Sequence, residues 1–468
     1  MFKLKLFLTG IAIWMLTVPL SVAQSSTKSD MLPAAAPDAQ IAGALRDVSA
    51  TRIEQTIVKL VSFYTRQTLS SDMPASSGKG VTAAADWIKS EFERYSKDCG
   101  GCLEVKTDEF TQEPGPRVPK PTKLTNVYAV LRGTDPANAS RIVLVTGHYD
   151  SRNSETNDTT GAAPGANDDA SGTAVSLECA RVLSKLKFPA TIIFLTVAGE
   201  EQGLDGSAHF AKMAKAQGWN IEAALNNDIV GGDRTPGLAG QDPHVVRVFS
   251  EGIPTTATAD EKQIKLVRAL GAESDSLSRE LARYIAATAQ QYLAPNSFHP
   301  LLVFRPDRFL RGGDHSSFNQ QGYAAVRFTE FRENYNHQHQ TLRTENGVEY
   351  GDLPKFVDYA YTANVARLNA ATLASLAAAP APPANVRILT KELQNDSTLV
   401  WEASPGGLAT AYEVLWRDTT AGEWQHAKSV GNATKATMPI SKDNVYFAVR
   451  AVDGKGHRSL AVTPLPER

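Results

Sequence analysis

The sequence predicts an α/β domain followed by an all-β domain, and three observations support this fold class. Two apolar runs rich in β-branched residues, 142–146 and 191–197, are typical of strands buried on both faces of a parallel sheet. A helical segment, 171–186, lies between them, as expected for strands that run in parallel. Beyond a Pro/Ala linker at 379–384, short alternating runs recur through 385–468, which is typical of a β-sandwich.

The first 23 residues have the features of a signal peptide. Lys3 and Lys5 precede a short apolar run, and Ser21-Val-Ala23 forms a small-residue cleavage site before Gln24. The run is short for a membrane span, although an uncleaved anchor is the alternative. We therefore expect an exported protein, periplasmic or secreted, with no membrane span after cleavage. Residues 24–45, rich in Ala, Ser, Pro and Asp, are expected to be flexible.

Composition and charge set further bounds. The chain has 468 residues, of which 42% are hydrophobic and 21% charged, as in ordinary soluble proteins. A formal net charge of −2 gives no reason to expect nucleic acid as a partner. Export permits a local disulfide between Cys99 and Cys102, whereas Cys179 is expected to be a small buried hydrophobe. Two cysteines are too few for a thiolate metal site, so carboxylates and imidazoles must supply any ligands.

The catalytic domain is expected to span residues 46–378. Helical periodicity or composition predicts helices at 46–69, 81–95, 171–186, 208–216, 275–293 and 352–378. Strands are predicted at 124–131, 141–146, 191–197, 223–229 and 324–329, and a Gly/Pro-rich surface loop at 231–243.

The C-terminal domain, 385–468, contains seven short predicted strands. They are 386–388, 397–402, 411–417, 424–430, 434–440, 445–452 and 459–462. Trp401, Tyr412 and Tyr446 are placed as core aromatics. This part of the chain resembles a fibronectin type III module, particularly in the run that begins Tyr446-Phe-Ala-Val-Arg.

Acidic and imidazole side chains follow the two apolar strands of the catalytic domain. His148 and Asp150 come after the first strand and Glu200 and Glu201 after the second, while Asp168 lies on the loop entering the helix between them. Ligands of open α/β sheets bind outside the carboxyl ends of the strands, so one crevice is expected to hold all five. Crowded carboxylates repel one another unless cations neutralise them, which predicts bound metal.

Five motifs in order resemble metallopeptidase family 28, the co-catalytic zinc exopeptidases. The motifs are His148-Tyr-Asp150, Asp168-Asp169, Glu200-Glu201, Asp228 and Gly313-Asp-His315, and the resemblance covers roughly residues 120 to 345. It implies a three-layer α/β/α sandwich with a mixed, mostly parallel sheet.

The resemblance also implies roles for these residues and two Zn²⁺ ions per chain. His148 and Asp228 would hold one zinc, Glu201 and His315 the other, and Asp168 would bridge both. Glu200 would be the general base, and Asp150 would orient His148. The family's peptide bond between Asp168 and Asp169 is cis, and we expect the same here.

Physical chemistry is consistent with these roles. Zinc takes nitrogen and oxygen ligands, and a bridging carboxylate allows two ions to lie about 3.5–4 Å apart. Such ions lower the pKa of a bound water, whose proton then needs a free carboxylate as acceptor. Cobalt or manganese would suit the same ligands.

The remaining histidines and the oxyanion donor are less determined by the sequence. Spacing alone does not rank His315 above the others. His337 and His339 follow the strand end at Glu330. They are candidates for contact with substrate or with a side chain that holds metal. His209 is expected to be structural, and His426 and His457 to lie on the surface.

Two further sets of residues are candidates for contact with substrate. Arg308 and Arg311 could receive a substrate carboxylate, although pairing with Asp307 or Asp314 is the alternative we favour. Tyr149, Tyr323 and backbone N–H groups are candidates for oxyanion stabilisation.

The sequence thus predicts an exported dizinc aminopeptidase acting on peptides or proteins, with a water held between the ions. A carboxypeptidase or a glutaminyl-cyclase-like enzyme on the same scaffold is the alternative. A non-catalytic binding or adhesion protein, with the C-terminal domain as its working part, is a third reading. The base Glu200 and a complete ligand set would be superfluous in that third case.

Overall fold

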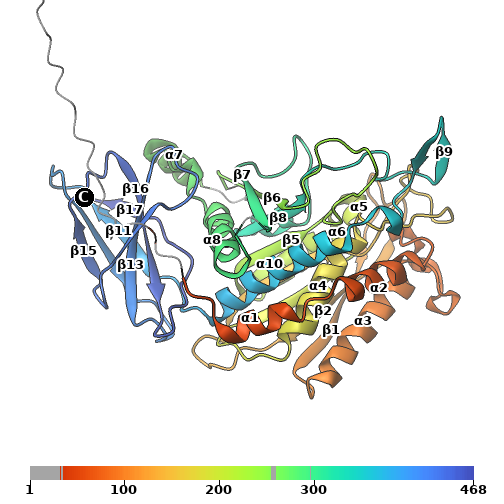
Figure 1. Ribbon diagram of the computed structural model, residues 1–468, viewed down its shortest axis with the longest axis horizontal. Coiled ribbons are helices and arrows are strands. Elements are labelled where there is room, and N and C mark those ends of the chain that lie inside the picture. The colour runs from red at the N-terminus through yellow and green to blue at the C-terminus, as the bar shows by residue number, and fades with distance from the viewer. Residues whose placement is uncertain (1–31, 33–34, 255–259, 296) are drawn as a thin grey trace, which may run out of the picture.

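The computed structural model describes residue 32 and residues 35–254, 260–295 and 297–468 (Figure 1). The predicted signal peptide lies outside these residues. Within them, no helix combines the length and apolar character needed to cross a membrane. Helix α1, Ala39–Arg46, falls in the segment predicted to be flexible, so that prediction is wrong there. Asp38 caps the helix by accepting hydrogen bonds from the backbone N–H groups of Gln40 and Ile41.

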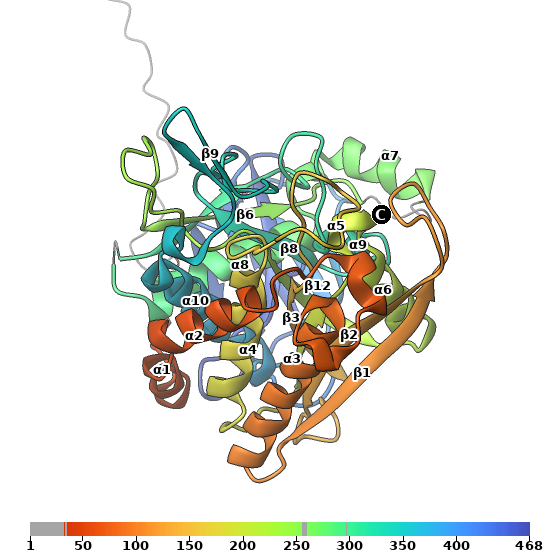
Figure 2. The same ribbon diagram turned by 90° about the vertical axis from the view of Figure 1, so that its right-hand side faces the viewer.

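An eight-stranded mixed sheet forms the centre of the catalytic part. Its order is β1-β2-β4-β3-β5-β8-β6-β7, and β4, β3, β5 and β8 run in parallel. The strands are β1 Leu103–Gln112, β2 Thr122–Leu131, β3 Arg141–His148, β4 Thr191–Val197, β5 Asn220–Asn227, β6 Val245–Ser250, β7 His299–Val303 and β8 Ala325–Glu330. A two-stranded hairpin, β9 Arg343–Glu345 with β10 Val348–Tyr350, projects from the body (Figures 1 and 2).

Helices cover both faces of the sheet and make three layers, so the predicted fold class is confirmed. Alternate residues of β3 explain this: Val143 and Val145 pack into one core, while Ile142 and Leu144 pack into another. The first core includes α1, α2, α3, α4, α8 and α10, and the second includes α6 and α9. The helix bounds are α2 Ala50–Val61, α3 Gly80–Asp98, α4 Ala170–Leu183, α5 Glu200–Gly203, α6 Asp205–Ala216, α7 Glu261–Leu270, α8 Leu277–Tyr292, α9 His315–Asn319 and α10 Tyr359–Ala378.

Several predicted boundaries differ from the structure. The helix predicted over 46–69 ends at Val61, and the one predicted over 352–378 begins only at Tyr359, where Asp358 is the N-cap. Strands β1, β6 and β7 of this sheet and helix α7 were not predicted. No residue of β7 is fully buried, and its sequence has no clear apolar periodicity from which a strand could be predicted.

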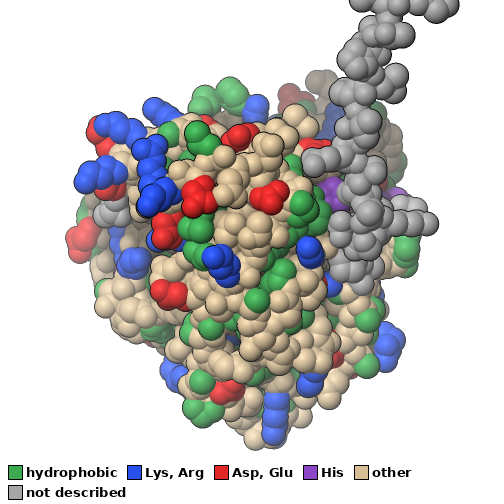
Figure 3. Space-filling view, turned by 90° about the vertical axis from the view of Figure 1, so that its left-hand side faces the viewer, with side chains coloured by type: hydrophobic (Ala, Val, Ile, Leu, Met, Phe, Trp, Pro, Cys, Tyr) green, Lys and Arg blue, Asp and Glu red, His purple; other side chains and the backbone are tan. Residues whose placement is uncertain are grey.

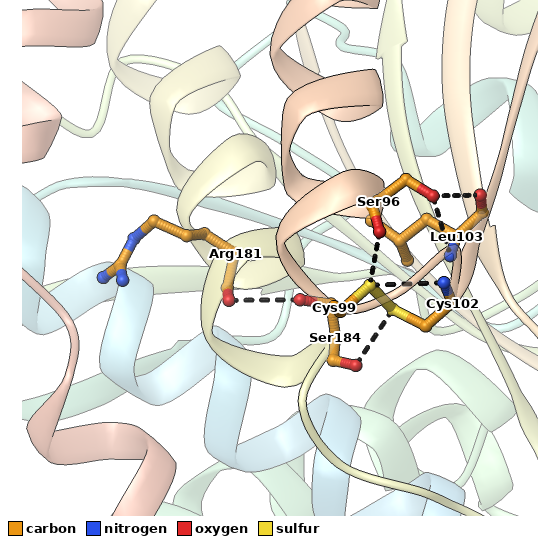
Figure 4. The surroundings of a disulfide bond; sticks show 6 residues. All are labelled: Ser96, Cys99, Cys102, Leu103, Arg181 and Ser184. Atoms are coloured by element: carbon orange, nitrogen blue, oxygen red, sulfur yellow. Dashed lines mark hydrogen bonds between the residues drawn. A yellow bond between two sulfur atoms is a disulfide. The ribbon is translucent and has the colours of Figure 1, made fainter.

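The predicted disulfide between Cys99 and Cys102 is present at the turn from α3 into β1 (Figure 4). The Ser96 hydroxyl helps to close this turn by donating to the Leu103 carbonyl at 2.7 Å and accepting from the Leu103 N–H at 3.3 Å. Cys179 is fully buried, as predicted.

The C-terminal domain, which begins with Ala384 and is called the tail unit below, contains two β-sheets. Their orders are β15-β12-β11-β17 and β14-β13-β16. The strands are β11 Ala384–Leu389, β12 Ser397–Glu402, β13 Ala411–Asp418, β14 His426–Ser429, β15 Lys435–Met438, β16 Val445–Val452 and β17 Leu465–Glu467. Trp401 and Tyr412 lie in the core between the sheets, as predicted. The resemblance to a fibronectin type III module remains a prediction.

Polar contacts of buried side chains join the tail unit to the catalytic part. The Trp424 indole N–H donates to Glu280 at 2.9 Å, and Arg283 Nε donates to the Gly422 carbonyl at 2.7 Å. Tyr446, predicted as a core aromatic, instead donates to the Gly271 carbonyl at 2.7 Å. His457, predicted on the surface, lies between Asp453 and Asp38. The outer face of this end of the molecule carries interspersed acidic and basic side chains (Figure 3).

Candidate metal centre

The carboxyl ends of the parallel strands bring the predicted site residues to one edge of the sheet. His148 is the last residue of β3, and Asp228 directly follows β5. Glu200 and Glu201 begin the short helix α5. Two residues separate it from β4, and one of them, Gly199, adopts a φ of 76° that favours glycine. Asp168 lies on the loop before α4, and its peptide bond to Asp169 is cis, as expected. The predicted residues therefore gather at one edge of the sheet.

One group of side chains could hold a metal ion at the end of β3. The ligand atoms of His148, Glu200 and Asp228 all lie within 4.8 Å of one another. His148 Nε2 is 3.9 Å from Asp228 Oδ1 and 3.2 Å from Asp168 Oδ1.

A second group of side chains that could hold a metal ion includes the other oxygen of Asp168. It consists of Asp168, Glu201 and His339, whose ligand atoms again lie within 4.8 Å of one another. His339 Nε2 is 2.8 Å from Asp168 Oδ2 and 3.0 Å from Glu201 Oε1. Since one oxygen of Asp168 faces His148 and the other faces His339, this carboxylate connects the two groups.

His315, predicted as a ligand, is not a member of either group of the described residues, and the histidine of the second group is His339. His315 begins helix α9, and its Nε2 lies 2.6 Å from the Pro306 carbonyl oxygen. Burial lowers the pKa of this imidazole to about 4. His339 belongs to the pair of histidines that the sequence placed after the strand end at Glu330, but its role as a possible ligand was not predicted. The other member, His337, pairs with Asp233 and stacks on Phe356.

Buried hydrogen bonds orient the side chains of the first group. Asp150 Oδ1 is 3.5 Å from His148 Nδ1, and its backbone carbonyl oxygen is 3.2 Å from the same nitrogen. The Asp150 carboxylate also accepts from the Thr68 hydroxyl at 2.8 Å and from the backbone N–H groups of Glu200 and Glu201. This single carboxylate thus connects the ends of β3 and β4, in agreement with an orienting role.

Two arginines and the carboxylate of Asp352 form contacts with the other residues of the two groups. Arg327, fully buried, forms an ion pair with Asp228 at 2.8 Å. Arg152 Nε donates to Glu201 Oε2 at 2.9 Å, and its Nη2 lies 2.7 Å from His339 Nδ1. Asp352 accepts from the backbone N–H of Asp168 at 2.7 Å. The ligand geometry is therefore fixed by partners outside the two groups.

The charge balance and the unpaired atoms both fit divalent cations. Burial raises the pKa of Glu200 well above its usual value, and nearby Asp228 and Glu201 raise it further. Burial alone would raise the pKa of Asp168, but His339 and His148 hold it well below its usual value. Among the buried atoms of the described residues that form no hydrogen bond are His148 Nε2 and Glu201 Oε1, which face Asp168 Oδ1 at 3.2 Å and His339 Nε2 at 3.0 Å. Imidazole nitrogens and carboxylate oxygens that face one another in this way are the ligands that zinc takes.

A cleft of about 860 Å³ opens over both groups. Asp168, Glu200, Glu201 and Asp228 line its floor, together with His339. Its walls include the turn at 115–118 and the loop at 308–312. Side chains of both walls are therefore in reach of a peptide bound at the floor.

The other side chains predicted as candidates for substrate contact form contacts within the protein instead. Arg308 and Arg311 both form ion pairs with Glu333, at 2.8 and 3.0 Å, and Arg308 also pairs with Asp307. Arg308 thus forms the pair with Asp307 that we favoured, whereas Arg311 pairs with Glu333, a partner that was not predicted. Tyr149 and Tyr323 donate their hydroxyl groups to the Thr125 and Trp219 carbonyls, so neither hydroxyl is free as an oxyanion donor.

The comparisons with known proteins agree with this geometry. The sequence model described as "Peptidase family M28" matches residues 126–347. A "Probable zinc metalloprotease" of Leptosphaeria maculans is 46% identical over 434 residues, which cover 92% of this chain and 98% of that protein. A second protein with the name "Probable zinc metalloprotease", from Pyricularia oryzae, is 43% identical over 451 residues, covering 94% of this chain and 88% of that protein.

Solved structures share the fold. The LapA aminopeptidase of Legionella pneumophila has a TM-score of 0.51 and 22% identity, covering 72% of this chain and 75% of its own. The aminopeptidase of Aneurinibacillus sp. strain AM-1 has a TM-score of 0.50 and 16% identity, covering 73% and 96%.

The fold, the two groups and the close relatives together define the class of protein, a zinc-dependent peptidase. The chain belongs to peptidase family M28.

Proposed function

We propose that this peptidase is an aminopeptidase that holds two zinc ions and releases N-terminal residues from peptides. The observation that carries the proposal is the position of Asp168, whose two carboxylate oxygens face His148 on one side and His339 on the other. This is the arrangement that a carboxylate shared by two ions requires. His148 and Asp228 would hold one ion, and Glu201 and His339 the other.

The ions, when bound, would polarise the scissile carbonyl and lower the pKa of the attacking water. Glu200 is the carboxylate left for proton transfer. It lines the cleft floor, and its raised pKa makes it a stronger proton acceptor once it is ionised. Glu200 takes the proton that the water loses on attack and passes it to the nitrogen of the leaving amine as the C–N bond breaks. Asp150 and Arg327 keep their positions in these steps and orient His148 and Asp228.

An acidic group beside the cleft floor favours aminopeptidase over carboxypeptidase activity. Asp205 lines the cleft, and its Oδ2 has no hydrogen-bond partner within the described residues. Burial raises the pKa of this carboxyl to about 6, so it is ionised at neutral pH. An ionised carboxylate in the lining of the cleft is suited to attract the ammonium group of a peptide N-terminus.

Export is part of the proposal. The disulfide at Cys99 and Cys102 supports an oxidising compartment, and the signal-peptide features of residues 1–23 support translocation. N-terminal sequencing of the protein from its natural source should then begin at Gln24. A sequence that begins at Met1 would contradict this part.

A panel of blocked peptides tests the activity. Peptides with a free N-terminus and an amidated C-terminus should be cleaved with release of the first residue, whereas N-acetylated peptides should be stable. Glu200→Gln is the matched control, because it keeps the size of the side chain but removes the proton acceptor. It should retain zinc and lose about 100-fold or more in kcat, the usual contribution of general acid–base catalysis. Release of C-terminal residues from acetylated peptides would support the carboxypeptidase alternative instead.

A further inference from the structure

A tight turn between β1 and β2 presents one arginine to the cleft. Gly115 and Val118 exchange backbone hydrogen bonds of 2.8 and 3.2 Å, which leaves Pro116 and Arg117 at the tip. Proline fixes the φ angle of its position, and Val118 anchors the turn because its side chain is buried. The turn therefore holds Arg117 in a defined direction on the cleft wall.

Arg117 differs from the other arginines of the cleft, whose charges are compensated by ion pairs with carboxylates. Arg152 pairs with Glu201, and Arg308 and Arg311 pair with Glu333. Arg117 Nη1 donates to the Glu201 backbone carbonyl at 3.0 Å, and no carboxylate of the described chain forms an ion pair with it. A guanidinium has five N–H donors in a planar fork, so donors remain for a bidentate contact with a carboxylate.

The position of this guanidinium sets which part of a substrate it can reach. Glu201 provides both the carbonyl that Arg117 contacts and the Oε1 that faces His339. The distance from the Arg117 guanidinium to the second group (Asp168, Glu201 and His339) is therefore about the distance between the backbone and the carboxylate of one glutamate. Since an extended peptide advances roughly 3.4 Å per residue, Arg117 is within about three residues of the cleaved bond.

We propose that Arg117 is a specificity-determining residue that binds a substrate carboxylate on the leaving-group side of the cleaved bond. The preferred substrates are dipeptides and short peptides, through their C-terminal carboxylate, or peptides with an acidic side chain at this position. This inference rests on the proposed aminopeptidase activity. An aminopeptidase holds the free amine of its substrate on one side of the cleaved bond, and the carboxylate proposed here lies on the other side, with the leaving group.

Two peptide pairs measure the effect in the zinc-loaded full-length protein. Leu-Leu against Leu-Leu-amide tests the C-terminal carboxylate, and Leu-Glu-amide against Leu-Gln-amide tests the acidic side chain. The wild type should prefer the carboxylate member of at least one pair in kcat/KM. Arg117→Gln should lower that preference by about tenfold or more, and Arg117→Lys should restore it in part.

Arg311→Gln is the matched control, since it removes another guanidinium of the cleft lining, one that is paired with Glu333. It should keep the wild-type preference. Equal preferences in the wild type and Arg117→Gln for both pairs would overturn the inference. Cleavage of acetyl-Leu-Leu with no cleavage of Leu-Leu-amide would instead overturn the proposed aminopeptidase activity, so the two failures are distinguishable.

Discussion

Replacing His339 by alanine should remove one ion and leave the other. His339 supplies the only nitrogen ligand of the second group, and without it two carboxylates remain, of which Glu201 is paired with Arg152 at 2.9 Å. Loss of a residue that merely supports a ligand costs about 10–100-fold in metal affinity, so loss of the ligand itself should cost more than about 100-fold. This corresponds to at least about 2.7 kcal/mol.

Isothermal titration of chelator-stripped protein with zinc measures this effect. The wild type should bind two ions, and His339→Ala should bind one with wild-type affinity and the other much more weakly. The matched variant is His315→Ala, which removes an imidazole that faces the Pro306 carbonyl instead of the two groups. It should bind both ions normally, although it should be less stable by about 1–3 kcal/mol because a buried polar contact is lost. Loss of an ion in His315→Ala with two ions in His339→Ala would refute the assignment.

Two predictions concern stability. Burial raises the pKa of Glu330 to about 8, so between pH 4.5 and 8 the folded state binds more protons than the unfolded state. The free energy of unfolding should therefore fall as pH rises through this window, by at most about 5 kcal/mol from this group. Glu330→Gln should flatten that fall in denaturant titrations at pH 5 and pH 9, and an unchanged pH dependence would contradict it. Replacing Cys99 and Cys102 by serine should cost only about 2 kcal/mol, because the disulfide closes a four-residue loop. A loss above 5 kcal/mol by the same titration would show that the turn has a larger role.

The side chains that follow central strands could be predicted from the sequence. Long apolar runs locate the ends of β3 and β4, and the polar residues after them, His148 and Glu200 among them, must lie at the same edge of a parallel sheet. Asp150 lies two residues after the end of β3, so local geometry largely fixes where it lies, whereas Asp168 is fixed by its place just before helix α4.

His339 could not be predicted in the same way. It lies nine residues after the end of β8, in a stretch without helix or strand, where no periodicity indicates the direction of a side chain. Its position depends on contacts with distant segments, such as that of its Nδ1 with Arg152. Spacing alone therefore left it indistinguishable from His315. The edge strand β7 was missed for a related reason, since an exposed strand needs no apolar pattern.

The number of ions that each folded chain needs for hydrolysis tests the central claim most directly. Chelator-stripped protein should be inactive on Leu-Leu-amide. On titration with zinc, its activity should reach a plateau only when two equivalents are bound, as measured by elemental analysis of the same samples. Full activity with one equivalent, or hydrolysis by metal-free protein, would contradict the account.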